Sequence, residues 1–378
     1  MLITRRLLAS VFAIGMAFGA PGSSKAADPI KIGLFVPLTG GVASTGVAIR
    51  EAVSMAIDEK NAAGGLLGRK IELVVADDAA KPEEATNIAR RFATRDEVLL
   101  AIGSATSPVS LAAAQVFREA QVPQIVVTST AQIITTQGNE WVFRSAAPDT
   151  KLIQDVVGFI KQKYPDVKKV ALLSVNDDFG KGGINTFQNA VKPLGMEIVA
   201  DERFASGDLD FTAQLTRIRD AKPDIIFEWD RYSEGSLIAR QMVQMGMNKI
   251  PRFGSDSFAA PKYIELGGDA VNGVMYPSPF SLTVSAGTPE AQSLIKKLKA
   301  AYNKEPDYNH VQAYDAITIA LAAIERAGKV DRAAVRDAIR KTDFQSPRGH
   351  FKFDAKGDPT FDTSIIRVVG QKETDARK

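Results

Sequence analysis

The 378-residue sequence contains no cysteine and only two histidines, His310 and His350. The missing cysteines exclude disulfides, thiolate catalysis and cysteine metal sites. Neither histidine has partners at metal-ligand spacing, which disfavours a metal site and a serine–histidine triad. No Gly-x-Ser-x-Gly nucleophile elbow is present either. We therefore expect a protein that is not an enzyme and that needs no metal and no cofactor.

A net charge of one sign is also missing once the amino-terminal segment is set aside. The formal charge is +3, from 47 basic and 44 acidic residues. The segment 1–26 carries Arg5, Arg6 and Lys25 and no acid, so the remainder balances 44 basic against 44 acidic residues. A neutral chain argues against a nucleic-acid partner.

Long apolar runs are absent apart from residues 7–20, which are too few for a permanent membrane helix. Arg5 and Arg6 precede this run, and small residues around Ser24 and Ala26 supply a cleavage point, as in a signal peptide. We expect residues 1–26 to be removed and the mature protein to lie in the periplasm. General secretion and the twin-arginine route both stay open.

The rest of the chain alternates short apolar strands with amphipathic helices, which is typical of an α/β fold with parallel sheets. The pattern breaks at residues 146–148, restarts, and breaks again at residues 277–279. We predict two Rossmann-like lobes with parallel central sheets, joined by a three-strand hinge. Lobe 1 would comprise residues 28–146 and 279–347, and lobe 2 residues 147–278 and 348–378.

The stretch 98–130 predicts one strand–helix–strand unit with polar residues at its carboxyl edge, where open α/β sheets bind ligands. Ser107 followed by Pro108 predicts a helix start with a hydroxyl N-cap. Thr128 and Thr130 end the second strand. The free N–H groups of a helix start favour an anion, so we expect a carboxylate site here.

Two other loops resemble functional motifs only in part. The loop 40–46 is rich in glycine but lacks the lysine of a phosphate loop, so a turn with positive φ, or a loop that admits a ligand, explains it better than nucleotide binding. Residues 177–180 contain Asp-Phe-Gly, as kinases do, without the companion kinase motifs. Phe179 is then either a core residue or a pocket wall.

Most acidic residues that follow strands are better explained by helix capping than by function. Asp256 is the exception, because it follows a strand of the second lobe and can face the first lobe across a cleft. The stretch 228–232 leaves two interpretations open. It makes a salt bridge and a cap between the lobes, or Trp229 or Tyr232 forms an aromatic wall while Asp230 or Arg231 contacts a polar ligand group.

These features together resemble the leucine/isoleucine/valine-binding protein family, the type I periplasmic solute receptors of ABC transporters. The similarity covers nearly the whole mature chain and rests on the order of its stretches rather than on one strong motif. The stretches are 32–46, 64–78, 103–107, 128–130, 143–144, 177–180, 254–256 and 314–316.

The resemblance implies two lobes that close on an amino acid. The family's carboxylate-binding serine falls on Ser107, and its carbonyl and threonine pair falls on Thr128 and Thr130, which would hold the carboxylate and part of the ammonium. The acid that neutralises the ammonium falls on Asp256.

The side-chain pocket of the family is matched less well. A tyrosine of the second lobe falls on Phe179, which loses a hydroxyl, and the aromatic lining of the first lobe falls near Thr45. A second aromatic position falls within 229–231, at Trp229 or Arg231, in a register that stays open.

We therefore expect a monomeric receptor that binds a small amino acid, branched-chain or otherwise apolar, and delivers it to a membrane ABC permease. The departures at Thr45 and Phe179 keep open an aromatic carboxylate, an amide or a dicarboxylate as the ligand. A third hypothesis, an exported hydrolase or a sensing domain without transport, has no positive signal in the sequence.

Overall fold

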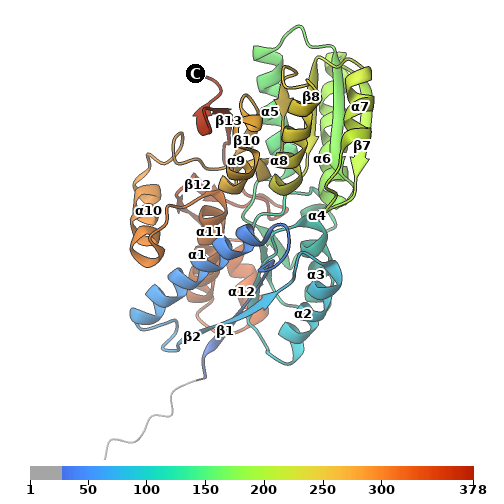
Figure 1. The fold of residues 1–378 in the computed structure, drawn as a ribbon. Coiled ribbons are helices and arrows are strands. Elements are labelled where there is room, and N and C mark those ends of the chain that lie inside the picture. Colours follow the sequence, from blue (N-terminus) through green and yellow to red (C-terminus); the bar gives the residue numbers. More distant parts are fainter. Residues whose placement is uncertain (1–27) are drawn as a thin grey trace, which may run out of the picture.

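The computed structural model describes residues 28–378, so the expected signal segment lies outside the described residues. Two open sheets with helices on both faces form two lobes, one at the bottom and one at the top of Figure 1. Within residues 28–378, no helix has the length and apolar character that a membrane crossing requires.

The first lobe contains a five-stranded sheet in which every neighbouring pair is parallel. Helices cover both faces, because each strand is followed by a crossover helix. Its strands, in the spatial order β2-β1-β3-β4-β5, are Ile71–Asp77, Ile30–Val36, Leu100–Ile102, Gln124–Val126 and Val142–Arg144.

The second lobe contains a seven-stranded sheet with a parallel centre and an antiparallel edge, where β13 pairs with β10 and β14 with β13. The sheets are therefore those of the expected α/β fold, with an added antiparallel edge. Its strands, in the order β14-β13-β10-β9-β8-β6-β7, are Lys372–Asp375, Ser364–Val369, Met275–Ser278, Arg252–Phe253, Ile225–Trp229, Lys169–Val175 and Glu197–Phe204.

Four of the described α-helices, α6, α10, α11 and α12, begin after residues whose side chains accept from free backbone N–H groups. Asp177 accepts from the N–H groups of Phe179 and Gly180, and Asp307 forms a capping box with His310. In chain order, α1 to α12 are Ala43–Ala62, Pro82–Thr94, Ser107–Glu119, Ile133–Thr136, Asp149–Lys163, Asp178–Val191, Thr212–Asp220, Tyr232–Gln244, Pro261–Gly267, Pro289–Tyr302, Tyr308–Ala327 and Arg332–Ile339. Short 3-10 helices span Lys192–Leu194, Asp256–Ala259 and Gly268–Val271.

The chain passes between the lobes after β5, after β10 and before β13. The strands β11 (Asp343–Ser346) and β12 (Gly349–Lys352) form a separate ribbon, and Phe351 and Phe353 pack into the core of the first lobe. The expected boundary at residue 348 is therefore wrong, and the third passage follows residue 353. Period-two alternation identified β12 as a strand but does not reveal its partner.

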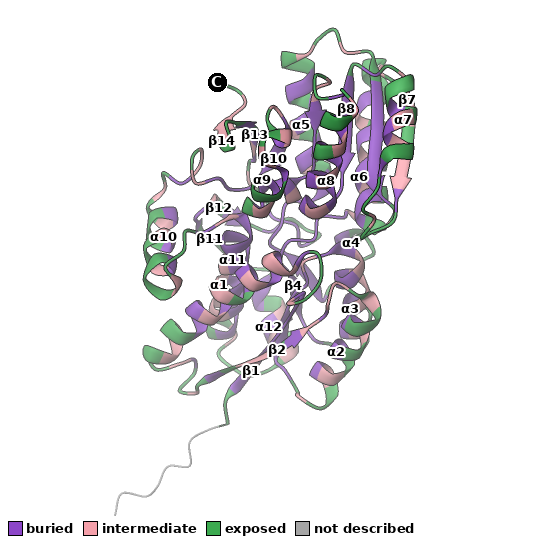
Figure 2. Ribbon diagram, in the orientation of Figure 1, coloured by how far each residue is buried: buried purple, intermediate pink, exposed green. Residues whose placement is uncertain are grey.

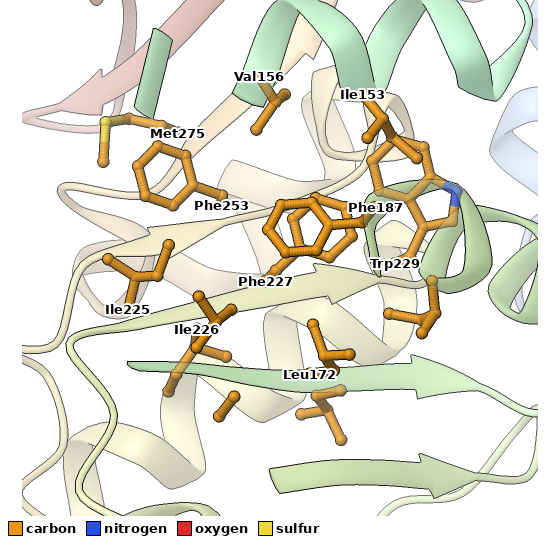
Figure 3. Close-up of a cluster of buried hydrophobic side chains, with 14 of the residues drawn as sticks. Ile153, Val156, Leu172, Phe187, Ile225, Ile226, Phe227, Trp229, Phe253 and Met275 are labelled. Atoms are coloured by element: carbon orange, nitrogen blue, oxygen red, sulfur yellow. The ribbon is translucent and has the colours of Figure 1, made fainter. Parts of the chain in front are cut away.

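Each lobe has its own buried core (Figure 2). In the first lobe, α1, α11 and α12 cover one face of the sheet, while α2 and α3 cover the other. In the second lobe, Phe227 stacks on Phe187 at 3.8 Å and on Trp229 at 5.3 Å between ring centroids (Figure 3). Two rigid bodies joined by three passages suit a hinge.

The glycine-rich loop before α1 is shaped by backbone packing. A Cβ at Gly46 would lie 1.9 Å from the carbonyl oxygen of Pro37, so only glycine fits, and Gly40 has a φ of +86°. The turn interpretation of this loop therefore holds. Its tip also faces the second lobe, because the Tyr232 hydroxyl donates to the Gly41 carbonyl.

Candidate functional site

A small cavity lies between the lobes, with walls from both sheets. It encloses about 400 Å³ of empty space, mouth included. The first lobe contributes Val42, Thr45, Thr106, Ser107, Thr128 and Thr130, among others, and the second lobe contributes Phe179, Arg231, Asp256 and Ser257. Seven of the eight residues expected from the sequence meet here, since Trp229 alone does not line the cavity.

The first-lobe wall presents hydroxyl groups beside a helix start. Ser107 and Thr130 are each 1% exposed. The Ser107 hydroxyl oxygen accepts from the Ala131 N–H at 3.3 Å, and the Thr128 hydroxyl donates to the Ala105 carbonyl at 3.0 Å. The hydroxyls of Thr106 and Thr130 are buried without a partner in residues 28–378. Such groups require a polar partner when the cleft is closed.

The start of α3 differs by one residue from the expectation. Thr106 is the N-cap and Ser107 the first helical residue, and neither side chain caps the helix. Pro108 thereby occupies the second helical position, where its missing N–H still costs nothing. The Ser107 hydroxyl oxygen accepts from the Ala131 N–H, which leaves the hydroxyl hydrogen available for donation to a ligand.

The second-lobe wall places a carboxyl group opposite these hydroxyls. Asp256 is 4% exposed and begins a short 3-10 helix after β9. Burial, together with the charge of Asp149, raises the pKa of Asp256 well above its usual range. A cation in the cavity would reverse this effect, because an opposite charge favours the ionised carboxylate.

Asp149, the first residue of α5, lies close enough to Asp256 for their charges to interact. Its N–H donates to the Thr130 carbonyl at 2.9 Å, and burial raises the pKa of its carboxyl to about 6, while the positive charge of Arg144 opposes the rise. Neither carboxyl oxygen has a hydrogen-bond partner among residues 28–378. The sequence analysis missed Asp149, which stands where helix-capping acids are common.

Phe179 and Arg231 form the remaining wall of the second lobe. The Arg231 guanidinium lies 5.5 Å from the Phe179 ring centroid and donates from Nη2 to Asp177 at 2.7 Å. Asp177 also caps α6, so the backbone fixes its carboxylate and the carboxylate fixes the guanidinium. The charged-aromatic stretch thus brings Arg231 to the cavity.

Trp229 lies instead in the core, fully buried between Phe227 and Phe179. The salt bridge expected for this stretch is present but stays within the second lobe, where Glu228 pairs with Arg252. β8 ends at Trp229, whereas Arg231 lies beyond the strand as the N-cap residue of α8, so the two side chains lie in different environments.

Tyr308 also lines the cavity and was not expected to do so. It is the first residue of α11, and burial, with the nearby charge of Asp256, raises its pKa well above the usual range. Its hydroxyl therefore stays protonated at neutral pH. No sequence signal separates this tyrosine from other helix-start residues.

A direct contact joins the two lobes at the rim of the cavity. The Tyr232 hydroxyl lies 2.7 Å from the Ser44 hydroxyl and donates to the Gly41 carbonyl at 3.0 Å. Tyr232 begins α8 of the second lobe, while Gly41 and Ser44 belong to the first. Its bonds exist only when the lobes are together.

The arrangement can bind a small zwitterion without metal chemistry. Hydroxyls and a helix start suit a carboxylate, and Asp256 suits an ammonium. In the described part of the chain, no three metal-ligating side chains gather at one place.

Comparison with known proteins identifies the family of this chain. Residues 29–373 match the family model described as periplasmic binding protein. A Pseudomonas aeruginosa protein named leucine-, isoleucine-, valine-, threonine- and alanine-binding protein is 31% identical over 361 residues, covering 95% of each chain.

Solved structures give the same result. The leucine-binding protein LivK of Thermotoga maritima superposes with a TM-score of 0.85 at 32% identity, over 92% of this chain and 97% of that one. Streptococcus pneumoniae LivJ in complex with isoleucine gives 0.84 at 30%, over 91% and 97%. A Rhodopseudomonas palustris solute-binding protein in complex with benzoate gives 0.83 at 25%, over 92% and 95%. The chain belongs to the periplasmic binding protein family that includes the Leu/Ile/Val-binding proteins.

Proposed function

We propose that this protein is a monomeric periplasmic receptor that binds an α-amino acid between its lobes and delivers it to a membrane ABC permease. The observation that carries the proposal is the pairing of Ser107 and Thr130 in one lobe with Asp256 in the other, around one cavity between the lobes. Relatives named for binding leucine, isoleucine and valine support the same ligand class. No catalytic step is part of this function.

The two ends of an amino acid match the two walls. Its carboxylate lies at the start of α3, where the hydroxyls of Ser107, Thr106 and Thr130 donate to it. Its ammonium lies against Asp256, and a buried ammonium without such a partner would be costly. Because the groups come from different lobes, the closed state binds best, and ligand shifts the hinge toward closure.

Replacing Asp256 by asparagine tests the ammonium contact. We expect amino-acid affinity to fall by about 2–5 kcal/mol, since the ammonium loses its countercharge. The free protein should stay folded, because burial already favours the neutral form of this carboxyl. Isothermal titration calorimetry measures the change, and Asp220→Asn, at an exposed acid of the same lobe, is the matched control.

Mass spectrometry of ligand released from the purified protein identifies the natural ligand. Unchanged affinity in a folded Asp256→Asn variant would overturn the role of Asp256. Binding of benzoate in preference to every α-amino acid would overturn the amino-acid assignment and favour an aromatic carboxylate.

A further inference from the structure

One polar atom in the cavity wall takes no part in the proposed contacts to the ligand's carboxylate and ammonium. Arg231 is 8% exposed and lines the cavity, yet its Nη1 is buried and finds no acceptor within the described part of the chain. A guanidinium does not lose its proton at physiological pH, so these donor hydrogens persist. A buried donor on a charged group that lacks an acceptor is costly.

The guanidinium is held in one orientation, so Nη1 does not find an acceptor by turning. Its Nη2 donates to Asp177 at 2.7 Å, and its plane lies near the Phe179 ring. Asp177 in turn accepts from the N–H groups of Phe179 and Gly180 at 2.9 and 3.2 Å. The planar fork of arginine then fixes Nη1 once Nη2 is fixed.

Arg231 stands among the residues that surround a ligand's side chain rather than its zwitterion. Once Ser107, Thr130 and Asp256 hold the backbone groups, the rest of the lining includes Val42, Thr45, Phe179, Arg231, Ser257 and Tyr308, besides small and hydroxyl residues near the start of α3. Val42, Phe179 and Tyr308 supply its apolar and aromatic surface. Arg231 is the one cationic residue of the lining, and its guanidinium is held in a fixed orientation. It can therefore select among ligand side chains.

The charge balance selects the type of acceptor. The positive charge of Arg231 is already matched by Asp177, and Asp256 is matched by the ligand's ammonium. A second negative charge on the ligand would be buried without compensation, whereas a neutral oxygen accepts a hydrogen bond at no such cost.

Building on the proposed function, we propose that the ligand is an uncharged α-amino acid whose side chain carries an oxygen acceptor, a hydroxyl or an amide, bonded to Arg231 Nη1. The site then prefers such a side chain over a hydrocarbon of equal size. This preference differs from that of a receptor with a purely apolar side-chain pocket.

Two pairs of ligands of similar shape test the preference in the unmodified protein. Calorimetry with threonine against valine, and with asparagine against leucine, should give at least about tenfold tighter binding of the oxygen-bearing member. Equal affinities, or tighter binding of valine and leucine, would overturn the proposal. Tighter binding of aspartate than of asparagine would overturn the requirement for a neutral acceptor.

The variant Arg231→Met assigns the preference to this side chain. The threonine-to-valine and asparagine-to-leucine affinity ratios should fall toward one, with circular dichroism showing a folded protein. A ratio that stays unchanged overturns the role of Arg231. The outcomes separate the two proposals: if no α-amino acid binds the unmodified protein, the proposed function fails, and if all bind without preference, only the present inference fails.

Discussion

Removing the Tyr232 hydroxyl should weaken ligand binding without touching the ligand. Tyr232→Phe keeps the buried ring and deletes the bonds to Ser44 and Gly41 that join the lobes. A neutral hydrogen bond contributes roughly 0.5–1.5 kcal/mol net. Because Gly41 is exposed and Ser44 partly so, water replaces much of what is lost. We expect a net loss of about 1 kcal/mol from the closed state, or roughly fivefold in Kd.

The assay is calorimetry with stopped-flow measurement of ligand release. The loss of affinity should appear mainly as faster release of the ligand, since the Tyr232 hydrogen bonds between the lobes exist only after closure. Tyr302→Phe is the matched control, because its hydroxyl donates to the Glu51 carbonyl at 3.1 Å within the first lobe. An affinity within twofold of the unmodified protein, or an equal loss in the control, would refute a latching role for Tyr232.

Two further predictions concern stability. Asp358 accepts from Arg144, 0% exposed, at 2.6 Å and from Thr135 at 3.0 Å, so Asp358→Ala should lower the free energy of unfolding by about 3–5 kcal/mol in urea titrations; a loss below about 1 kcal/mol contradicts this. Burial raises the pKa of Asp78 from 3.8 to about 6, so the folded protein keeps a proton that the unfolded chain releases, and stability falls as pH rises from about 4 to 6. Asp78→Asn should reduce that fall by roughly 2–3 kcal/mol in urea titrations at pH 4 and pH 7, and an unchanged pH profile would count against the raised pKa.

The meeting of Ser107, Thr128, Thr130 and Asp256 was predictable from sequence, because parallel strands deliver the loops at their carboxyl ends to one edge. The resemblance then supplied the pairing of the two edges across a cleft. The placement of loops at the carboxyl edge of a parallel sheet does not define the position of each residue within a loop. The sequence therefore did not show that Thr106 is the N-cap of α3.

The register at Trp229 and Arg231 could not be decided in the same way. A strand buried on both faces has no polar alternation, and all of Ile225–Trp229 is buried. Tyr308 was missed for another reason, since its place beside Asp256 depends on how α11 returns to the first lobe. Such long-range packing leaves no local pattern.

The division of the two cores also sets the order in which they can be completed as the chain is made. All buried members of the second lobe's main cluster except Ile365 come from residues 147–275. The corresponding cluster of the first lobe joins residues 30–143 to residues 313–353. The core of the first lobe thus stays incomplete until residues 313–353 are made, although β13 and β14 of the second sheet follow later still. A chain emerging from its amino terminus can nearly complete the second core while the first still exposes apolar strands, which makes that unfinished sheet the part most in need of protection during biogenesis.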